Sequence, residues 1–506
     1  MNYIAYDLGT SGVKASLHDE HLGTLARSVI EYKTFYPQNG YHEQRPEDWW
    51  NGIADSTKRL LEMSGVAPDE IACVALSGHS CVAVPLDAHG ELLTEYVPIW
   101  SDMRARDEAE KFFKKIDNDF WYMTTGNGFP APCYALFKLM WYQKHCPTLF
   151  AKISKFVGSK DYINFKLAGV VCTDYSYASG LGVYDLKEKK IRADFLEAAG
   201  IPLRIFPEVV PSHTIIGHVT KDAAQKTGLN VGTPVACGGV DNACMALGAV
   251  GPESGCVYTS LGSSAWIPVN SHEPILDTRK RPYVFAHIQE DMFTSAFSIF
   301  AGGSSLQWAK DVLCEDLRSE ADIYRKIEQL AAASPIGSNG ILFNPSLAGG
   351  TAQDKSVNIH GAYIGLSLAT TRSDMLRAVL EGVALNLKTA LDYLSQKVPL
   401  TEQILFCGGG SKMAFWMQMF ADVFNMEVVK TNIDQDAASI GAAAICARAL
   451  GAWSDYKKVP ALHRIEQRFL PQAESSRKYE QVFHVFNHVS DELSALGDYM
   501  IAHATK

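Results

Sequence analysis

Two short turn segments, about half a chain apart, restrict the fold more than any other feature. The chain carries D-L-G-T-S-G-V at residues 7–13 and S-L-G-S-S-A-W at residues 260–266. Each follows an apolar, strand-like run and contains a glycine among small hydroxyl residues. Their matching places in the two halves of the chain indicate a duplication. We therefore expect two similar domains, and we predict that they cover residues 1–248 and 249–506.

Short apolar runs alternate with longer helical patterns along the chain. Residues 71–76 and 404–407 predict strands, each of which ends at a glycine. A capping-box pattern at residues 371–374 opens a segment whose apolar residues recur at helical spacing. This alternation predicts an α/β protein. A chain of 506 residues is too long for one core and suits two domains.

Charge and hydropathy exclude several classes of function. The net charge of −10 argues against a broad surface for nucleic acid or for an anionic membrane. No apolar run approaches the ~20 residues that span a bilayer, and the N-terminus lacks the pattern of a secretory signal. The 11 cysteines include no CxxC pair, which predicts buried free thiols. We expect a cytoplasmic protein that binds neither nucleic acid nor a membrane.

The first turn has the chemistry of a phosphate site. Glycine lets the backbone approach a ligand closely, and turn N–H groups with Ser and Thr hydroxyls donate hydrogen bonds to an anion. This favours Gly9, Thr10 and Ser11 as phosphate ligands, and Asp7 beside them can hold Mg²⁺ through water. An ordinary hairpin is the alternative for such a turn in isolation. No GxxxxGK[ST] segment occurs, which excludes a P-loop enzyme.

Two further glycine-rich segments follow strand-like runs. G-G-G-S-K at residues 408–412 suits a base or phosphate lying against the backbone, or simply a close strand–helix contact. Gly238 and Gly239 precede Asp241, so the carboxylate stands at a strand end where it can touch a ligand. The alternative for Asp241 is the N-cap of a helix.

Taken together, these segments resemble the FGGY carbohydrate kinases, which have the actin-like ATPase fold. The resemblance covers residues 1 to about 455, and its pieces stand in the family's order. They are residues 7–12, 41–50 (Y-H-E-Q-R-P-E-D-W-W), 173–180 (T-D-Y-S-Y-A-S-G), 239–242 (G-V-D-N), 260–264, 303–308 (G-S-S-L-Q-W) and 408–412. The resemblance implies two actin-like (ribonuclease H-like) α/β domains that face each other across a central cleft.

The resemblance also implies a reaction, the transfer of the γ-phosphate of ATP to a sugar hydroxyl. Asp241 would accept the proton of the attacking hydroxyl, and Asp7 would help to anchor Mg²⁺. The residues implied for binding the phosphates and the adenosine of ATP are Gly9, Thr10, Ser11, Gly262, Ser263, Gln307, Gly409 and Gly410.

The substrate side departs from the family pattern. Xylulokinase-like members carry Q-M-H-G after a strand-end Ser-Gly, whereas this chain has H-S-C-V at residues 79–82. W-S-D at residues 100–102 resembles their W-N-D. We predict substrate contacts by His79, Asp102, Asn127 and Asp241, with a structural role as the alternative for His79. The favoured acceptor is a ketopentose such as xylulose, and a polyol (glycerol, erythritol) or a sugar acid (gluconate) is the alternative.

A non-catalytic nucleotide-binding protein on the actin-like fold is the alternative from another class. Such a protein would need the phosphate turns, but it would not need residues 41–50 and 173–180 or the acid at position 241. These features favour the kinase. We expect the protein to bind a small sugar or polyol. A homodimer is the alternative to a monomer.

Overall fold

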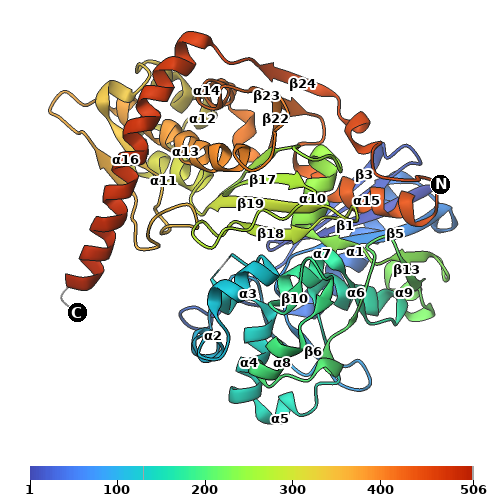
Figure 1. The fold of residues 1–506 in the computed structure, drawn as a ribbon. Helices are drawn as coiled ribbons and strands as arrows, with labels where there is room; N and C mark the ends of the chain where they lie inside the picture. The colour runs from blue at the N-terminus through green and yellow to red at the C-terminus, as the bar shows by residue number, and fades with distance from the viewer. Residues whose placement is uncertain (129, 504–506) are drawn as a thin grey trace. The chain divides into compact units, whose positions relative to one another are not determined.

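The computed structural model describes residues 1–128 and 130–503, and the chain forms two compact units (Figure 1). Unit 1 comprises Met1–Glu253, His272–Thr294 and Asp436–Leu462, and unit 2 comprises Ser254–Ser271, Ser295–Gln435 and His463–Lys506. Each unit is thus assembled from several segments, whereas the predicted boundary between residues 248 and 249 divides the chain once. That boundary stays a prediction. Residues 129 and 504–506, which fall within the predicted domains, lie outside the described residues.

Unit 1 is built on a seven-stranded sheet. Its strands are β1 (Asn2–Leu8), β2 (Gly12–His18), β3 (Thr24–Glu31), β5 (Ile71–Gly78), β13 (Ile215–His218), β14 (Pro234–Ala236) and β15 (Gly239–Val240). They lie in the order β13-β14-β5-β1-β2-β3, and β15 also pairs with β5. β1, β2 and β3 form an antiparallel meander, whereas β5 lies parallel to β1. β1 and β5 are apolar and buried, as expected for central strands.

The helices that pack on this sheet come from both ends of the chain. They are α1 (Pro46–Ser64), α6 (Ser159–Ala168), α10 (Asp241–Val250) and α15 (Ala437–Ala449), and α9 (Lys221–Thr227) packs on α1 and α6. α1 packs on β2 and β3, and α15 packs on β1 and β5. The C-terminal half of the chain therefore completes the unit that the N-terminal half begins.

α10 and α15 touch backbone to backbone. A Cβ added at Gly248 would lie 1.8 Å from the carbonyl oxygen of Ala437, and one added at Gly441 would lie 2.0 Å from that of Cys244. Such distances are far shorter than a van der Waals contact, so any larger residue would clash. Glycine at both positions therefore permits the close approach of the two helices. This contact fixes the helix that begins at Asp241.

A second part of unit 1 has its own apolar core, in which Phe112, Trp121, Phe137 and Phe195 are almost completely buried. Its helices are α2 (Arg106–Phe113), α3 (Asn118–Thr125), α4 (Ala135–His145), α5 (Pro147–Phe150), α7 (Tyr175–Ala178) and α8 (Ala193–Ala199). Its short strands are β4 (Glu43–Gln44), β6 (Val84–Leu86), β7 (Val97–Pro98), β8 (Lys155–Val157), β9 (Cys172–Asp174), β10 (Tyr184–Asp185), β11 (Lys190–Ile191), β12 (Glu208–Val210) and β18 (Tyr283–Ala286).

Unit 2 repeats the central arrangement of unit 1. Its main strands are β16 (Tyr258–Leu261), β17 (Ala265–Ser271), β19 (Phe293–Ile299), β22 (Gln403–Cys407), β23 (Glu427–Thr431) and β24 (Ile465–Phe469). They lie in the order β19-β17-β16-β22-β23-β24. β16 and β17 form an antiparallel hairpin, and β22 lies parallel to β16, as β5 does to β1. The two predicted turns therefore occupy equivalent places in two similar sheets.

Five long helices belong to unit 2, together with the short strands β20 (Leu342–Asn344) and β21 (Ala362–Ile364). They are α11 (Gly303–Leu313), α12 (Ile323–Ala332), α13 (Arg372–Ser395), α14 (Ala414–Phe424) and α16 (Ala473–His503). The predicted capping box is confirmed, because the Thr371 side chain accepts a hydrogen bond from the backbone N–H of Asp374 at the start of α13. α16, the long red helix in Figure 1, packs on α13 and α14.

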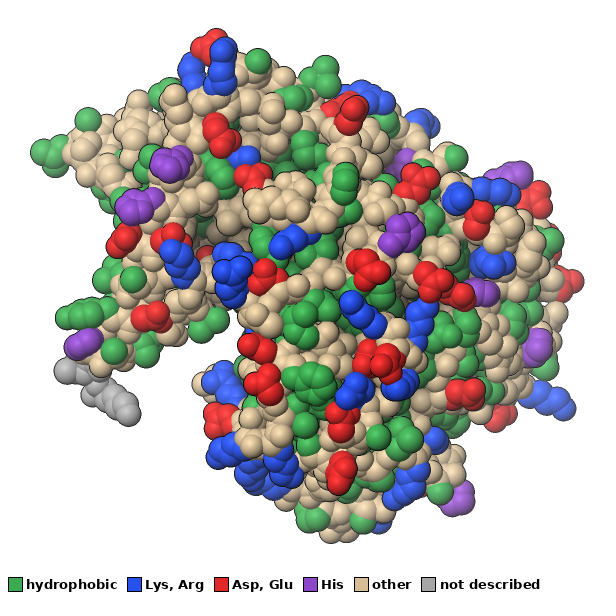
Figure 2. Space-filling model, in the orientation of Figure 1, with side chains coloured by type: hydrophobic (Ala, Val, Ile, Leu, Met, Phe, Trp, Pro, Cys, Tyr) green, Lys and Arg blue, Asp and Glu red, His purple; other side chains and the backbone are tan. Residues whose placement is uncertain are grey.

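The described surface agrees with the acidic net charge. On the face shown in Figure 2, the drawn Lys and Arg side chains are interspersed with Asp and Glu and form no broad basic area. In the described part of the chain, no helix is both long enough and apolar enough to cross a membrane.

Candidate active site

Three parallel strands of unit 1 end in register at one edge of the sheet. Leu8 of β1 lies opposite Gly78 of β5, and Gly78 lies opposite Val240 of β15. The segments that begin at Gly9, His79 and Asp241 therefore leave the sheet side by side. In open α/β sheets, this carboxyl-terminal edge is where ligands bind.

Asp241 is the first residue of α10. Val240 holds the N-cap position and makes no side-chain cap, so the alternative that Asp241 is the N-cap is wrong. The carboxylate accepts one hydrogen bond of 2.8 Å from the backbone N–H of Asn242, and the residue remains partly exposed. Burial, with a further contribution from the negative charge of Asp7, raises the pKa of Asp241 to about 7. Such a carboxylate can accept a proton near neutral pH.

Asp7 lies at the end of β1 and is 8% exposed. Its Oδ1 accepts a hydrogen bond of 3.2 Å from the Ser77 hydroxyl, and its Oδ2 lies 3.9 Å from the Lys14 ammonium. Burial raises the pKa of Asp7, against the opposing effects of Lys14 and Ser77. The negative charge of Asp7 makes ionisation of Asp241 more costly, so a cation beside Asp7 would stabilise the ionised form of both carboxyl groups.

The turn after β1 is held by side chains from distant segments. The indole Nε1 of Trp100 donates a hydrogen bond of 2.9 Å to the Thr10 hydroxyl, and the Gln44 amide donates one of 2.6 Å to the Thr10 carbonyl. Since the Thr10 oxygen accepts from the indole, its own hydrogen can point to a ligand. Ser11 is exposed, and Gly9 closes the hairpin with a hydrogen bond of 3.0 Å to Gly12.

The segment at residues 41–50 supports this turn, a role that the sequence did not reveal. The Gln44 side-chain carbonyl accepts a hydrogen bond of 3.0 Å from the Trp49 indole, which fixes the amide that holds Thr10. Both side chains are completely buried. The segment therefore holds the turn that is predicted to bind phosphate.

His79 is only 1% exposed. Its Nδ1 lies 3.0 Å from the carbonyl oxygen of Leu8, and its ring packs edge-on against Trp49 at 5.2 Å between centroids. Burial lowers the pKa of His79 to about 4, so the ring is neutral and Nδ1 carries the proton facing that carbonyl. Nε2 has no hydrogen-bond partner among the described residues and remains an acceptor. Contact of His79 with the sugar stays a prediction.

Asp102 is completely buried in an ion pair with Arg104. Its Oδ1 accepts from the Nε and backbone N–H of Arg104, and its Oδ2 accepts from Nη2 of Arg104 and from the backbone N–H of His42. The guanidinium lies over the ring of Tyr41, 4.0 Å from the centroid. All the acceptor positions of Asp102 are therefore in use, and a substrate hydroxyl would have to displace one of these donors; contact of Asp102 with the substrate stays a prediction.

Asn127 is 2% exposed and joins two segments of unit 1. Its amide nitrogen donates to the carbonyl oxygens of Ser179, at 2.7 Å, and of Thr125, at 3.2 Å. Among the described residues, its Oδ1 has no hydrogen-bond partner. A ligand hydroxyl could supply that donor, so contact with the substrate stays a prediction for Asn127.

Unit 2 contains a cavity of about 820 Å³ that is lined by every residue predicted for the nucleotide in this unit. These residues are Gly262, Ser263, Gln307, Gly409 and Gly410. Others that line it, among them Asp322, Tyr324, Arg325 and Glu328 of α12 and the turn before it, carry no motif and were missed. The volume is ample for a nucleotide.

The turn after β16 is tied to the start of α11. The backbone N–H of Gly303 donates a hydrogen bond of 2.9 Å to the carbonyl of Gly262, and that of Ser304 donates one of 3.0 Å to the carbonyl of Ser263. Farther along α11, the Gln307 amide is oriented by Tyr324, whose hydroxyl donates to it at 2.8 Å. The turn is thus held in place at the cavity, which Gly262 and Ser263 line, and the N–H of Gly262 is used within the hairpin by a hydrogen bond of 3.0 Å to the carbonyl of Ser264.

The three glycines after β22 have different surroundings. A Cβ added at Gly409 would meet no atom within 4 Å, whereas one added at Gly410 would lie 2.5 Å from the side chain of Leu261. Gly408 has a positive φ of 92°, which favours glycine. Position 409, which lines the cavity, therefore has room for a larger side chain.

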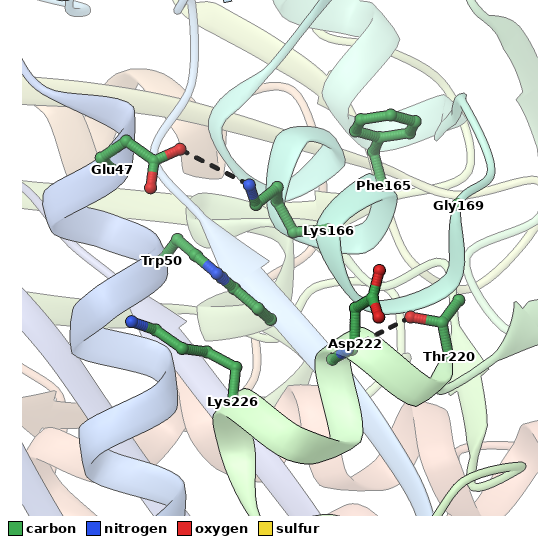
Figure 3. A pocket seen from close by; sticks show the side chains of 9 residues that line it. Glu47, Trp50, Phe165, Lys166, Gly169, Thr220, Asp222 and Lys226 are labelled. Atoms are coloured by element: carbon green, nitrogen blue, oxygen red, sulfur yellow. Dashed lines mark hydrogen bonds and ion pairs between the residues drawn. The ribbon is translucent and has the colours of Figure 1, made fainter. Parts of the chain in front are cut away.

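A second cavity, of about 490 Å³, lies in unit 1 among α1, α6 and α9 (Figure 3). Trp50 lies between Lys166 and Lys226, and the ammonium of Lys166 lies 3.5 Å from the Glu47 carboxylate. Asp222 lies near the start of α9, on the other side of the cavity from Glu47. The cavity includes none of the residues predicted for the site.

Comparison with known proteins agrees with this geometry. Residues 2–248 match the N-terminal domain of the FGGY family of carbohydrate kinases, and residues 257–450 match its C-terminal domain. The chain belongs to the FGGY family of carbohydrate kinases. It is a phosphotransferase with an alcohol acceptor, and its nucleotide substrate is ATP.

Individual FGGY relatives match over almost the whole chain. Xylulose kinase from Bacillus subtilis (strain 168) is 31% identical over 97% of this chain and 98% of its own length, and gluconokinase from Bacillus licheniformis is 27% identical over 97% and 96%. The structure of xylulose kinase from Rhodospirillum rubrum superposes with a TM-score of 0.89 at 27% identity and covers 98% of this chain and 100% of its own. The predicted two-domain actin-like fold is confirmed.

Proposed function

We propose that this FGGY kinase phosphorylates a ketopentose, with xylulose as the favoured acceptor and Asp241 as the catalytic base. Six relatives with 26–31% identity to this chain are xylulose kinases, and the matches cover 89–99% of their own length. The observation that carries the proposal is the position of Asp241 at the sheet edge, beside the phosphate turn, with its pKa raised to about 7.

The buried cations of unit 1 favour a neutral acceptor over a sugar acid. Each of them is already paired with protein oxygens, so a substrate carboxylate would have to displace a partner. Lys138 donates to the carbonyls of Cys81 and Ile99, Arg104 is paired with Asp102 and Glu43, and Lys160 is paired with Asp161 and Asp174. A ketopentose has only hydroxyl and carbonyl groups, which need no such cation.

In the proposed reaction, the residues of this chain hold the reactants and accept one proton. Asp241 takes the proton of the acceptor hydroxyl while the hydroxyl oxygen attacks the γ-phosphorus and ADP leaves. The turn at Gly9, Thr10 and Ser11 and the turn at Gly262 and Ser263 donate hydrogen bonds to phosphate oxygens. Gly409, Gly410 and Gln307 line the cavity proposed for adenosine.

Mg²⁺ fits the acidic groups of unit 1. In the described residues, no group of three or more His, Cys, Asp or Glu is arranged to hold a metal. Mg²⁺ commonly keeps several waters and takes only one or two carboxylates together with substrate phosphates. We propose that Asp7 holds the ion, where its charge would relieve the repulsion between Asp7 and Asp241. The ion would neutralise charge on the transferred phosphate.

The activity should depend on pH through Asp241. Because the ionised form is needed and burial has raised the pKa to about 7, we expect kcat/KM for ATP to rise with a midpoint near pH 7 and to level off at higher pH. This parameter reports the protein before ATP binds. The residual activity of Asp241→Asn should lack the transition. A midpoint near the ordinary value of 3.8 would contradict the assignment.

A coupled ADP-release assay with xylulose, glycerol, erythritol and gluconate tests the substrate. We expect kcat/KM for xylulose to exceed that for each of the others by at least about tenfold, since unmatched polar groups in a site are costly. Asp241→Asn, prepared in the same way, controls for contaminating kinases. A preference for gluconate would reject the proposal of a neutral acceptor. ADP release that does not depend on any sugar would reject the proposal that the site transfers phosphate to a sugar hydroxyl.

A further inference from the structure

A buried serine links the segment at residues 173–180 to the peptide that carries the proposed base. The Ser176 hydroxyl accepts a hydrogen bond of 2.9 Å from the backbone N–H of Val240 and donates one of 2.5 Å to Oδ2 of Asp174. Ser176 and Asp174 are both completely buried, and Val240 directly precedes Asp241. The hydroxyl is therefore used in both directions, as donor and as acceptor.

Asp174 is held on several sides. Its carboxylate accepts from the Ser212 hydroxyl at 2.7 Å and from the backbone N–H of Ser176 at 3.0 Å, and Lys160 lies 3.1 Å from Oδ1. Lys160 is also paired with Asp161 at 2.6 Å. A buried network in which each member has partners is rigid, so the Ser176 hydroxyl has little freedom to move.

The Val240 peptide, which donates this hydrogen bond to Ser176, has little other backbone support. β15 is two residues long and pairs with β5 on one side. A Cβ added at Gly239 would lie 2.3 Å from Ile288, 3.0 Å from Cys244 and 3.2 Å from the Ser176 hydroxyl. Ser176 thus supports the edge of β15 that faces away from β5, immediately before the chain turns into α10.

We propose that Ser176, oriented by Asp174, is a positioning residue for catalysis: it fixes the Val240 peptide and thereby the place of the Asp241 carboxylate. The inference rests on the proposed role of Asp241 as the base. It gives the segment at residues 173–180 a task distinct from contact with the sugar. A displacement of about 1 Å in a catalytic group can cost on the order of 100-fold in rate.

Ser176→Ala tests the proposal, with Ser212→Ala as the matched control. Both variants remove one hydroxyl donor from the same Asp174 oxygen, but only the first also removes the acceptor for Val240. We expect Ser176→Ala to lower kcat by about 10- to 100-fold with little change in KM for sugar or ATP, and Ser212→Ala to stay near wild type. Equal losses in the two variants, or near wild-type kcat in Ser176→Ala, would overturn the proposal.

The double variant shows whether Ser176 acts through Asp241. In the Asp241→Asn background, Ser176→Ala should change the residual rate by less than about threefold, because the base that it positions is gone. A fall as large as in the wild-type background would mean an independent role and would overturn the inference. If Asp241→Asn itself kept full activity, the proposed base and the inference would both fail. If Asp241→Asn were inactive but Ser176→Ala kept full activity, Asp241 would stand as the base, and only the positioning role of Ser176 would be rejected.

A second substitution covers the case in which Ser176→Ala does not fold. Ser176→Cys keeps nearly the same volume, but a thiol is a weak donor and a weak acceptor. Its kcat is expected to fall in the same direction by a smaller factor, with unchanged KM. A folded Ser176→Cys protein with wild-type kcat would overturn the proposal.

Discussion

Asp241→Asn is expected to lower kcat by at least about a hundredfold while ATP still binds. Asparagine has almost the same shape and can still hydrogen-bond a hydroxyl, but it cannot usefully accept the proton. General-base assistance typically contributes about 10²- to 10⁴-fold in rate. Steady-state kinetics with xylulose, together with calorimetric titration of ATP, would separate the loss of chemistry from a loss of binding.

The stability of the Asp241→Asn protein should rise, whereas its kcat falls. Folding raises the pKa of Asp241 from 3.8 to about 7, so ionisation of this group costs stability as the pH rises through that range. Asparagine removes the cost, and the variant should be at least as stable as wild type at about pH 8, with the difference fading as the pH falls toward 3.8. Thermal unfolding at several pH values measures this.

Asp222→Asn is the matched control for this substitution. Asp222 is an exposed acid in the first turn of another helix of the same unit, so its loss should leave kcat unchanged. A stable Asp241→Asn protein with sugar-dependent ADP release close to wild type would reject Asp241 as the base.

Gly409→Val is expected to weaken ATP binding by about tenfold or more, since a misfitting group in a binding pocket commonly costs about 10- to 200-fold. The added side chain has room in the protein itself, because a Cβ at this position meets no atom within 4 Å. It would instead occupy part of the cavity that we propose for adenosine. KM for ATP and calorimetric affinity measure the effect, and KM for the sugar should stay the same.

Gly410→Ala provides the comparison, because its Cβ would lie 2.5 Å from Leu261. That variant should lose thermal stability, whereas Gly409→Val should unfold close to the wild-type temperature. Unchanged ATP affinity in a folded Gly409→Val protein would remove this loop from the proposed nucleotide site.

The sequence was a good guide where chemistry is local. The two hairpin turns, the strand before the three glycines and the capping box at Thr371 each depend on residues close together in the chain, and the structure confirms them. The prediction that Asp241 stands at a strand end is confirmed for the same reason, since the glycines and the strand lie within a few residues of it.

Features that depend on distant partners were not predictable in this way. Nothing near His79 in the sequence shows that its Nδ1 faces the carbonyl of Leu8, and nothing near Asp102 specifies the way in which Arg104 folds back on it. α12 lines the cavity of unit 2 with residues that form no motif, because only the fold brings them there. A helical pattern identifies the buried side of such a segment, but not its neighbours.

The contact between α10 and α15 also bears on the order in which the protein can form during synthesis. Domains generally fold as units while the chain emerges from its N-terminus, and contacts between distant segments are slow to form. α15 leaves the ribosome after most of unit 2 has been made, yet it packs on β1 and β5 and holds α10. Until then, the glycine-bearing face of α10 is uncovered. The unit that starts first is therefore completed late, and the helix carrying Asp241 gains its final support only near the end of translation.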